Sequence, residues 1–169
     1  WYEFDVPAGG RVVLRLRLPS LTAPDAATGR SWAAVGGVAI AGLMIDAGPV
    51  NSRLLMQVGT RHGRGGHHHR GQAHAGEPTA LQDVFLRIGG PHAGKARVSL
   101  EVNSDGVILD NIWAWRADHG NPGAFGWDVS TGDTGVIVNG DDVTATGLFV
   151  EHYQKTEVVW NGEGGTVVF

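Results

Sequence analysis

Four segments of the chain share one alternation of apolar and polar positions. They are "VAIAGLMI" (38–45), "LQDVFL" (81–86), "VILDNIWA" (107–114) and "VTATGLFV" (143–150). In each segment a small or polar residue stands directly before an apolar one, and another apolar or small residue follows two places later. A period of two puts one face of a strand inward. The segments therefore predict strands that repeat along the chain.

A second pattern repeats Asn, a small residue and an acid after an apolar strand, at Asn103, Asn139 and Asn161. The last two are 22 residues apart, which is about one coil of a parallel β-solenoid. The first two are 36 apart, which leaves room for one coil and an inserted loop of roughly 14 residues. In such a coil identical turns lie above one another, so we expect the three amides to stack as an internal ladder.

These repeats decide the expected fold class. Almost no stretch has the periodicity of a capped helix, which leaves a β-solenoid, a β-sandwich and a jelly roll as alternatives. An antiparallel sandwich gives no reason to repeat Asn, small residue and acid. We therefore predict an all-β, right-handed parallel β-helix, partial or truncated. It is a single domain over residues 1–169, with a Gly/His-rich loop at 60–78 and an inserted loop at 118–133.

Composition narrows the class of partner. The net charge of −4 and the pI near 6.0 leave no basic stripe for nucleic acid or an anionic membrane, and a neutral substrate fits better. The chain has no cysteine, so it has no thiolate metal site. Its longest apolar stretch, 32–45, is too short and too rich in glycine to span a membrane. The N-terminus lacks the order of a signal peptide, which indicates a mature or excised segment.

The stretches "DNIWAWRADHG" (110–120) and "DTGVIVNGDDVTATGLFVEHYQKTEVVWNGEGG" (133–165) resemble a known family. They are similar to the pectate-lyase-like β-helix module of family 55 glycoside hydrolases, as found in actinobacterial secreted proteins often labelled coagulation factor 5/8 type domain proteins. The resemblance covers roughly residues 80–169. It implies a secreted, extracellular enzyme that hydrolyses a polysaccharide such as β-1,3-glucan with inversion, in a cleft along the helix.

The resemblance also implies site residues. Glu151 falls on the family's first active-site carboxylate and His152 on the histidine that follows it. The family's general acid would come about one coil later, beyond Phe169. We therefore expect the isolated chain to be a weak or inactive hydrolase.

The residues also support a second catalytic hypothesis. Asp118, Asp141 and Asp142 could form the Asp triad of an α-1,3-glucanase-like or polygalacturonase-like hydrolase. However, the Asn column places Asp141 above Asp105, as expected of a repeated acidic turn that holds backbone amides or a cation. Both interpretations stay open at this point.

Aromatic and imidazole side chains near these acids are the candidate substrate-binding residues. Trp115 lies on the same strand face as Trp113, and Trp127 follows in the inserted loop, where indoles either line a cleft or fill the core. His119 follows Asp118 directly. His152 and Tyr153 complete the set.

The strand end at "EHYQ" sets a geometric condition. Glu151 and Tyr153 share one face of an unbent strand, and His152 faces the other. All three can line one cleft only if the strand bends, so we expect a bend or bulge there.

The segment 61–78 contains five histidines on a Gly-rich background without preset geometry, so we predict a mobile loop there. No metal site and no cofactor is predicted for the chain. A non-catalytic carbohydrate-binding or structural β-solenoid module is the rival function.

The end of the sequence, "GGTVVF", predicts a strand over 166–169 with an open edge. We expect this edge to be covered by the chain's N-terminal region or by a neighbouring copy. Self-association and further domains of a larger parent chain are therefore the expected partners besides the saccharide.

Overall fold

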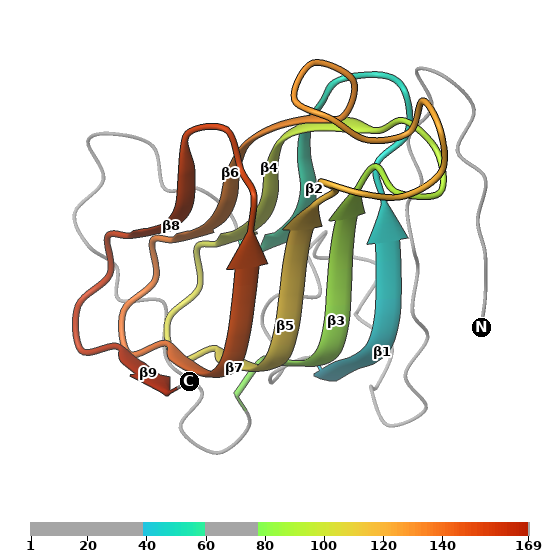
Figure 1. The fold of residues 1–169 in the computed structure, drawn as a ribbon. Coiled ribbons are helices and arrows are strands. Elements are labelled where there is room, and N and C mark those ends of the chain that lie inside the picture. The colour runs from blue at the N-terminus through green and yellow to red at the C-terminus, as the bar shows by residue number, and fades with distance from the viewer. Residues whose placement is uncertain (1–38, 60–77, 169) are drawn as a thin grey trace, which may run out of the picture.

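The computed structural model describes residues 39–59 and 78–168, and its ribbon consists of strands joined by turns and loops (Figure 1). The strands are β1 (Ala39–Asp46), β2 (Ser52–Val58), β3 (Ala80–Ile88), β4 (Lys95–Val102), β5 (Ile108–Arg116), β6 (Thr131–Val138), β7 (Thr144–Glu151), β8 (Thr156–Trp160) and β9 (Thr166–Val168). Within the described ranges there is no helix, and so none that is long and apolar enough to cross a membrane.

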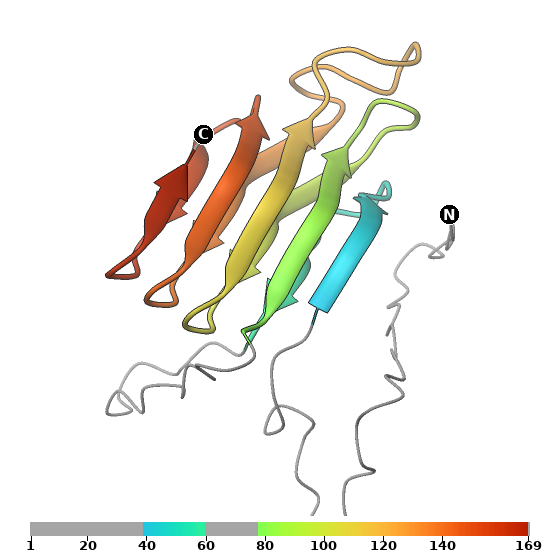
Figure 2. The same cartoon turned by 90° about the horizontal axis from the view of Figure 1, so that it is seen from below.

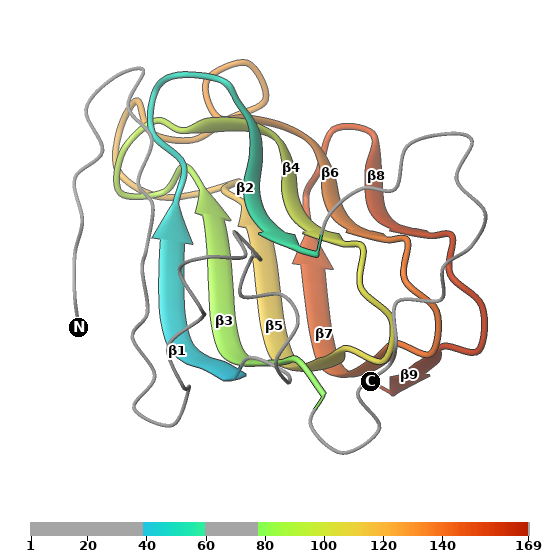
Figure 3. The same cartoon turned by 180° about the vertical axis from the view of Figure 1, so that it is seen from behind.

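The strands form two parallel sheets that the chain visits alternately. One sheet has the order β1-β3-β5-β7-β9, and the other has the order β2-β4-β6-β8. All pairings are parallel. Figure 2 shows successive coils side by side along one axis, and Figure 3 shows the second sheet from behind. The parallel β-helix is confirmed, and the antiparallel sandwich and jelly roll are excluded.

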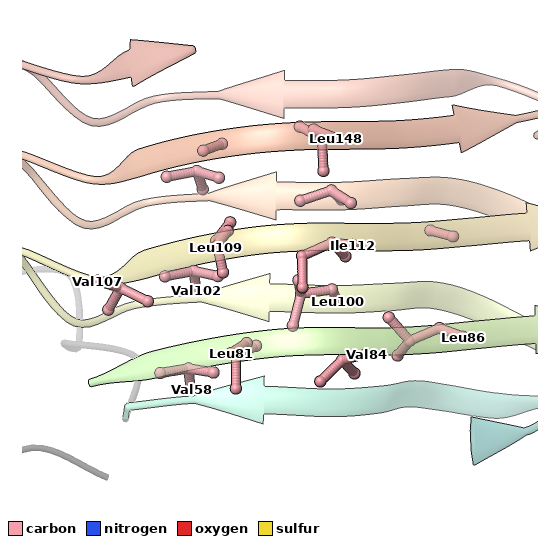
Figure 4. Close-up of a cluster of buried hydrophobic side chains, with 14 of the residues drawn as sticks. Val58, Leu81, Val84, Leu86, Leu100, Val102, Val107, Leu109, Ile112 and Leu148 are labelled. Atoms are coloured by element: carbon pink, nitrogen blue, oxygen red, sulfur yellow. The ribbon is translucent and has the colours of Figure 1, made fainter. Parts of the chain in front are cut away.

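The core lies between the two sheets and is built from columns of aliphatic side chains. Leu81 pairs with Leu109, and Val84 pairs with Ile112, which in turn pairs with Leu148. All five are at most 5% exposed (Figure 4). Burying one such side chain contributes about 1.5–3 kcal/mol. Stacking aliphatic residues coil upon coil therefore contributes a large part of the stability of the fold.

The four aligned segments of the sequence are β1, β3, β5 and β7, and their small or polar residue has a specific role. Gly42, Asp83, Asn111 and Gly147 all adopt a left-handed backbone, with φ of 66°, 52°, 53° and 61°. Glycine, aspartate and asparagine are the residues that tolerate this conformation best. A left-handed residue interrupts the alternation of the two strand faces. Leu81 and Val84, which flank the left-handed Asp83 and are three positions apart, therefore both face the core.

The stacking of the three asparagines is confirmed, but the ladder is not internal throughout, because Asn103 is buried whereas Asn139 and Asn161 are exposed. Asn139 Nδ2 donates to Asn103 Oδ1 at 2.7 Å, and Asn161 Nδ2 donates to Asn139 Oδ1 at 2.8 Å. The chain of hydrogen bonds extends to the buried Glu101, because Asn103 Nδ2 donates to Glu101 Oε1 at 3.0 Å. The ladder fixes the register of three successive turns.

The acids of the same turns bind backbone amides. Asp105 Oδ1 accepts a hydrogen bond from the Asp141 amide at 2.9 Å, and Asp141 Oδ1 accepts one from the Glu163 amide at 2.9 Å. The interpretation of these acids as a structural turn is thus confirmed.

The chain end forms the expected strand over Thr166–Val168, which pairs with β7 and is exposed. Its cover by a neighbouring copy stays a prediction. The N-terminal region and most of the His-rich loop, at 1–38 and 60–77, lie outside the described residues.

The left-handed column yields a stability prediction. A Cβ at Gly147 meets no atom closer than 3.5 Å, so Gly147→Ala is penalised by backbone strain rather than by a clash. We expect Gly147→Ala to lower the free energy of unfolding by about 1–2 kcal/mol in urea denaturation. Gly147→Asn should lower it less, because Asn111 occupies the same column. Equal losses for the two variants would contradict the role of the column.

Candidate functional site

The site lies where β5 and β7 end, on the outer face of the β1-β3-β5-β7-β9 sheet. The inserted loop begins here, and it runs over 117–130 rather than 118–133 because Thr131–Asp133 belong to β6. Figures 1 and 2 both show this loop beside the shorter loop that follows β3. Residues at the ends of two coils are thereby brought onto one surface.

An apolar and largely aromatic column crosses the outer face of this sheet. Met44, Phe85, Trp113 and Phe149 occupy paired positions on successive coils. The Phe85 and Trp113 rings meet edge to face at 6.0 Å, and Phe149 is 54% exposed. Aromatic faces exposed to water are costly unless a partner covers them. The column is therefore a candidate platform for the apolar faces of sugar rings.

Trp113 and Trp115 share a face, as their spacing in the strand predicts. Their rings stack at 5.3 Å with an interplanar angle of 17°. Trp115 also contacts the His119 ring at 5.0 Å and is only 7% exposed. Trp115, which we expected to bind substrate, is therefore largely covered by its neighbours, and Trp113 is the more accessible of the two.

Two carboxylates and two histidines gather at the end of this platform. The Trp113 indole donates to Glu151 Oε1 at 3.0 Å, which orients the carboxylate. His152 Nε2 lies 3.8 Å from Glu151 Oε2 and 3.5 Å from Asp118 Oδ2. Asp118 Oδ1 is 2.7 Å from His119 Nδ1. Glu151, His152 and Asp118 each remain nearly half exposed, so a ligand can reach them.

The contacts of the two carboxylates with His152 set an upper limit on the distance between them. Both approach the same nitrogen of His152, so Asp118 Oδ2 and Glu151 Oε2 are no more than about 7 Å apart. Inverting glycosidases separate their carboxyl groups by about 6.5–9.5 Å, and retaining ones by about 5–5.5 Å. The spacing is compatible with glycoside hydrolysis and does not select between these stereochemical outcomes.

Asp118 is held in its ionised form. The hydrogen bond from His119 is the main cause that lowers the pKa of Asp118 below its usual range, and the charges of His152 and His119 act in the same direction. An ionised aspartate can accept a proton or stabilise positive charge. It cannot donate a proton at neutral pH.

The bend expected at the strand end is present. β7 ends at Glu151, and His152 has a left-handed backbone with φ of 66°. This reversal leaves Glu151 and His152 together on the outer surface and turns Tyr153 inward. The geometry explains how adjacent polar residues of "EHYQ" serve different sides of the molecule.

The expectation that Tyr153 binds substrate is corrected by the structure. Its side chain is 6% exposed, and its hydroxyl lies 2.6 Å from Ser99 Oγ in the core. Burial raises the pKa of Tyr153 above its usual range. The phenol is therefore a neutral, structural group.

The Asp triad is not assembled either. Asp141 and Asp142 lie in the turn between β6 and β7, whereas Asp118 follows β5. In a parallel coil these two kinds of turn stack at opposite ends of the strands, as Figure 1 shows. Asp141 is also engaged by the Glu163 amide. The geometry therefore offers no support for the hypothesis of an α-1,3-glucanase-like or polygalacturonase-like triad.

Sequence reasoning missed three features of this surface. Phe85 and Phe149 would follow from extending the Trp113 column to neighbouring coils. Arg116 is only 4% exposed and lies against the ring of Trp127, which is 57% exposed. No pattern of side chains in the sequence indicates this contact. Over residues 39–59 and 78–168, no group of three or more His, Asp or Glu side chains is arranged to hold a metal ion.

Fold and surface together define a parallel β-helix with an aromatic and acidic outer face. The family model of the LAM55 pectate lyase-like domain matches residues 3–169, and the chain belongs to this family.

A curated relative is an exo-beta-1,3-glucanase of Streptomyces sp. strain SirexAA-E, 46% identical over 98% of this chain and 26% of the relative. Two solved structures of sacteLam55A from the same organism are similar. A variant in complex with glucose is 51% identical, with a TM-score of 0.71 over 79% of this chain and 23% of that one. The second is 52% identical, with a TM-score of 0.70 over 80% of this chain and 23% of that one. The chain thus spans about a quarter of these proteins' length.

The structural role of Tyr153 can be tested by removing its hydroxyl. Tyr153→Phe leaves the buried Ser99 hydroxyl without this partner, and we expect the free energy of unfolding to fall by about 1–3 kcal/mol. Adding Ser99→Ala removes the stranded group, so the double variant should recover part of the loss. A double variant as unstable as the sum of the singles would contradict this pairing.

The state of Asp118 yields a pH prediction. In His119→Ala the hydrogen bond that lowers the pKa of Asp118 is lost, so this pKa should rise toward its ordinary value. The carboxylate would then become protonated at a higher pH as the pH falls. Carboxyl carbon NMR titration measures this directly, with Asp110, which is hydrogen-bonded to Thr146 and Gln82, as an internal control that should not move.

Proposed function

We propose that this chain forms part of the substrate-binding and hydrolytic site of a secreted β-1,3-glucan hydrolase that acts with inversion. One observation carries the proposal. Glu151 is hydrogen-bonded to Trp113 of the aromatic column, and both Glu151 and Asp118 lie beside His152. The similarity to an exo-beta-1,3-glucanase supports glucan as the substrate. A polysaccharide substrate of this kind is in keeping with an extracellular protein.

In the proposed mechanism the aromatic column binds sugar rings through their apolar faces. A ring stacked on Trp113 brings its glycosidic bond toward the end of β7, where the carboxylates lie. The indole N–H occupies Glu151 Oε1, so Oε2 faces the surface on the side of His152. Glu151 is thereby oriented to remove a proton from the attacking water.

Inversion requires a second, protonated carboxylic acid at the leaving oxygen. The ionised Asp118 does not meet this requirement, because its pKa is lowered. We therefore propose that the proton donor comes from another part of a longer protein. In this proposal Asp118 stabilises positive charge near the reacting carbon and keeps His152 in place.

The rival function is a non-catalytic carbohydrate-binding or structural module. A structural module gives no reason for an accessible aromatic column that ends at two ionisable side chains. A pure binding module explains the column but not the carboxylate oriented by Trp113. Hydrolysis therefore accounts for more of the surface.

Binding is tested with laminari-oligosaccharides and the isolated chain. Trp113→Ala should weaken their binding about tenfold, which equals about 1.4 kcal/mol, as measured by calorimetry. Trp160→Ala is a matched control, because Trp160 lies on β8 of the other sheet. Equal weakening by the two variants would contradict the proposed platform.

Catalysis is tested separately. We expect slow or no shortening of the oligosaccharides by the isolated chain, and loss of any turnover in Glu151→Gln, followed by chromatography of the products. Glu151→Gln should bind the sugars about as well as the unchanged chain. Turnover that survives this substitution would show that another group is the base.

A further inference from the structure

We propose that Arg116 is a positioning residue that holds the bend at His152 against the inserted loop, and so fixes Asp118 relative to Glu151. The inference deepens the proposed function and rests on it. Arg116 itself touches neither carboxylate in the hydrogen bonds described below. It acts through the two backbone segments from which the carboxylates project.

The guanidinium group of Arg116 joins two segments that are distant in sequence. Its Nε donates to the carbonyl oxygen of His152, the left-handed residue after β7. Its Nη1 donates to the carbonyl oxygens of Gly126 at 3.3 Å and Ser130 at 3.2 Å, both in the inserted loop. One planar side chain thus ties the loop of one coil to the bend of the next.

A second connection runs beside the first. The Trp127 ring lies over the guanidinium group, whose carbon is 4.9 Å from the ring centroid. The Trp127 carbonyl accepts a hydrogen bond from Gln154 Nε2 at 2.7 Å, and Gln154 Oε1 accepts one from the Gly132 amide at 3.0 Å. We name Arg116, Trp127 and Gln154 the loop clamp.

The coil stack itself does not require an arginine at this position. In the parallel register Arg116 pairs with Ile88 of the preceding coil, which is apolar and fully buried. Burial lowers the pKa of Arg116, which reflects the cost of keeping a charge beneath the surface. An aliphatic residue would fill the space without that cost. The arginine appears in the coil that carries both the inserted loop and Asp118.

The loop clamp stabilises two backbone segments, the bend at His152 and the end of the inserted loop. A left-handed backbone at a residue other than glycine costs about 1–2 kcal/mol and persists only where its surroundings hold it. The hydrogen bond to the His152 carbonyl supplies such support. At the other end, Gly126 and Ser130 close the inserted loop whose start carries Asp118 and His119. Loosening either end would let His152 move away from Asp118.

A double-mutant cycle in the full 169-residue chain tests the positioning role. Arg116→Met should weaken binding of laminari-oligosaccharides about tenfold, and so should His152→Ala. Combining them should add little to the more severe single change, because both act on the same arrangement. Losses that multiply would overturn the proposal.

Matched variants separate geometry from charge and from the loop surface. Arg116→Lys keeps the charge but cannot reach three carbonyl oxygens in one plane, so it should behave like Arg116→Met. Full binding in Arg116→Lys would overturn the clamp. Trp127→Leu should weaken binding, whereas Phe125→Leu, a change at an exposed aromatic of the same loop, should not. Equal effects of these two would also overturn it.

Hydrogen exchange gives a readout that needs no sugar. The amides of Ser130 and Gln154, bonded to Gly126 and Gly132, should exchange at least about tenfold faster in Arg116→Met. The amide of Val136, in the middle of β6, should be unchanged. Faster exchange at all three sites would show a general structural role and overturn the inference. If the unchanged chain binds no laminari-oligosaccharide, the proposed function fails, while this exchange pattern still decides on the clamp.

Discussion

The parallel register between coils is the constraint on which the rest of the structure depends. Every pairing of strands is parallel, so a residue lies directly above its counterpart in the coil before. A slip of one residue would turn the apolar columns outward. The asparagine ladder and the acidic turns oppose such a slip on one side, because their hydrogen bonds between coils join equivalent positions of neighbouring turns.

The register also creates the functional surface. Because equivalent residues of successive coils stack in columns, aromatic residues at one position of each repeat form a continuous outer row. The left-handed residues of β3, β5 and β7 shift the alternation in all these strands at the same place. As a result the rows of Phe85, Trp113 and Phe149 stay aligned on one face, and the strand ends place Glu151 beside the row.

The sequence predicted the repeating part of the molecule well and the non-repeating part less well. The strands of the first sheet follow from the period of two, the asparagine ladder from a repeated motif, and the bend at His152 from the alternation of strand faces, so all three are visible in the side-chain pattern. Tyr153 was misassigned because a reversal of backbone direction at His152 changes which face the next residue occupies. Arg116 was missed because its partners are backbone carbonyls of residues 10 to 36 positions away, and no side-chain pattern records them.

The inserted loop rests on the coils on both of its sides. Toward the preceding coil, the Asn121 amide donates to the Gly90 carbonyl, and Gly90 in turn donates to the Ala124 carbonyl, at 2.8 and 2.9 Å. Gly120 packs so closely on Gly90 that a Cβ there would collide with the backbone. Toward the following coil, Arg116 and Gln154 make the connection. Because the loop is held on both sides, the backbone segments that carry Asp118 and Glu151 have fixed positions relative to each other. The geometry of the site therefore depends on three consecutive coils.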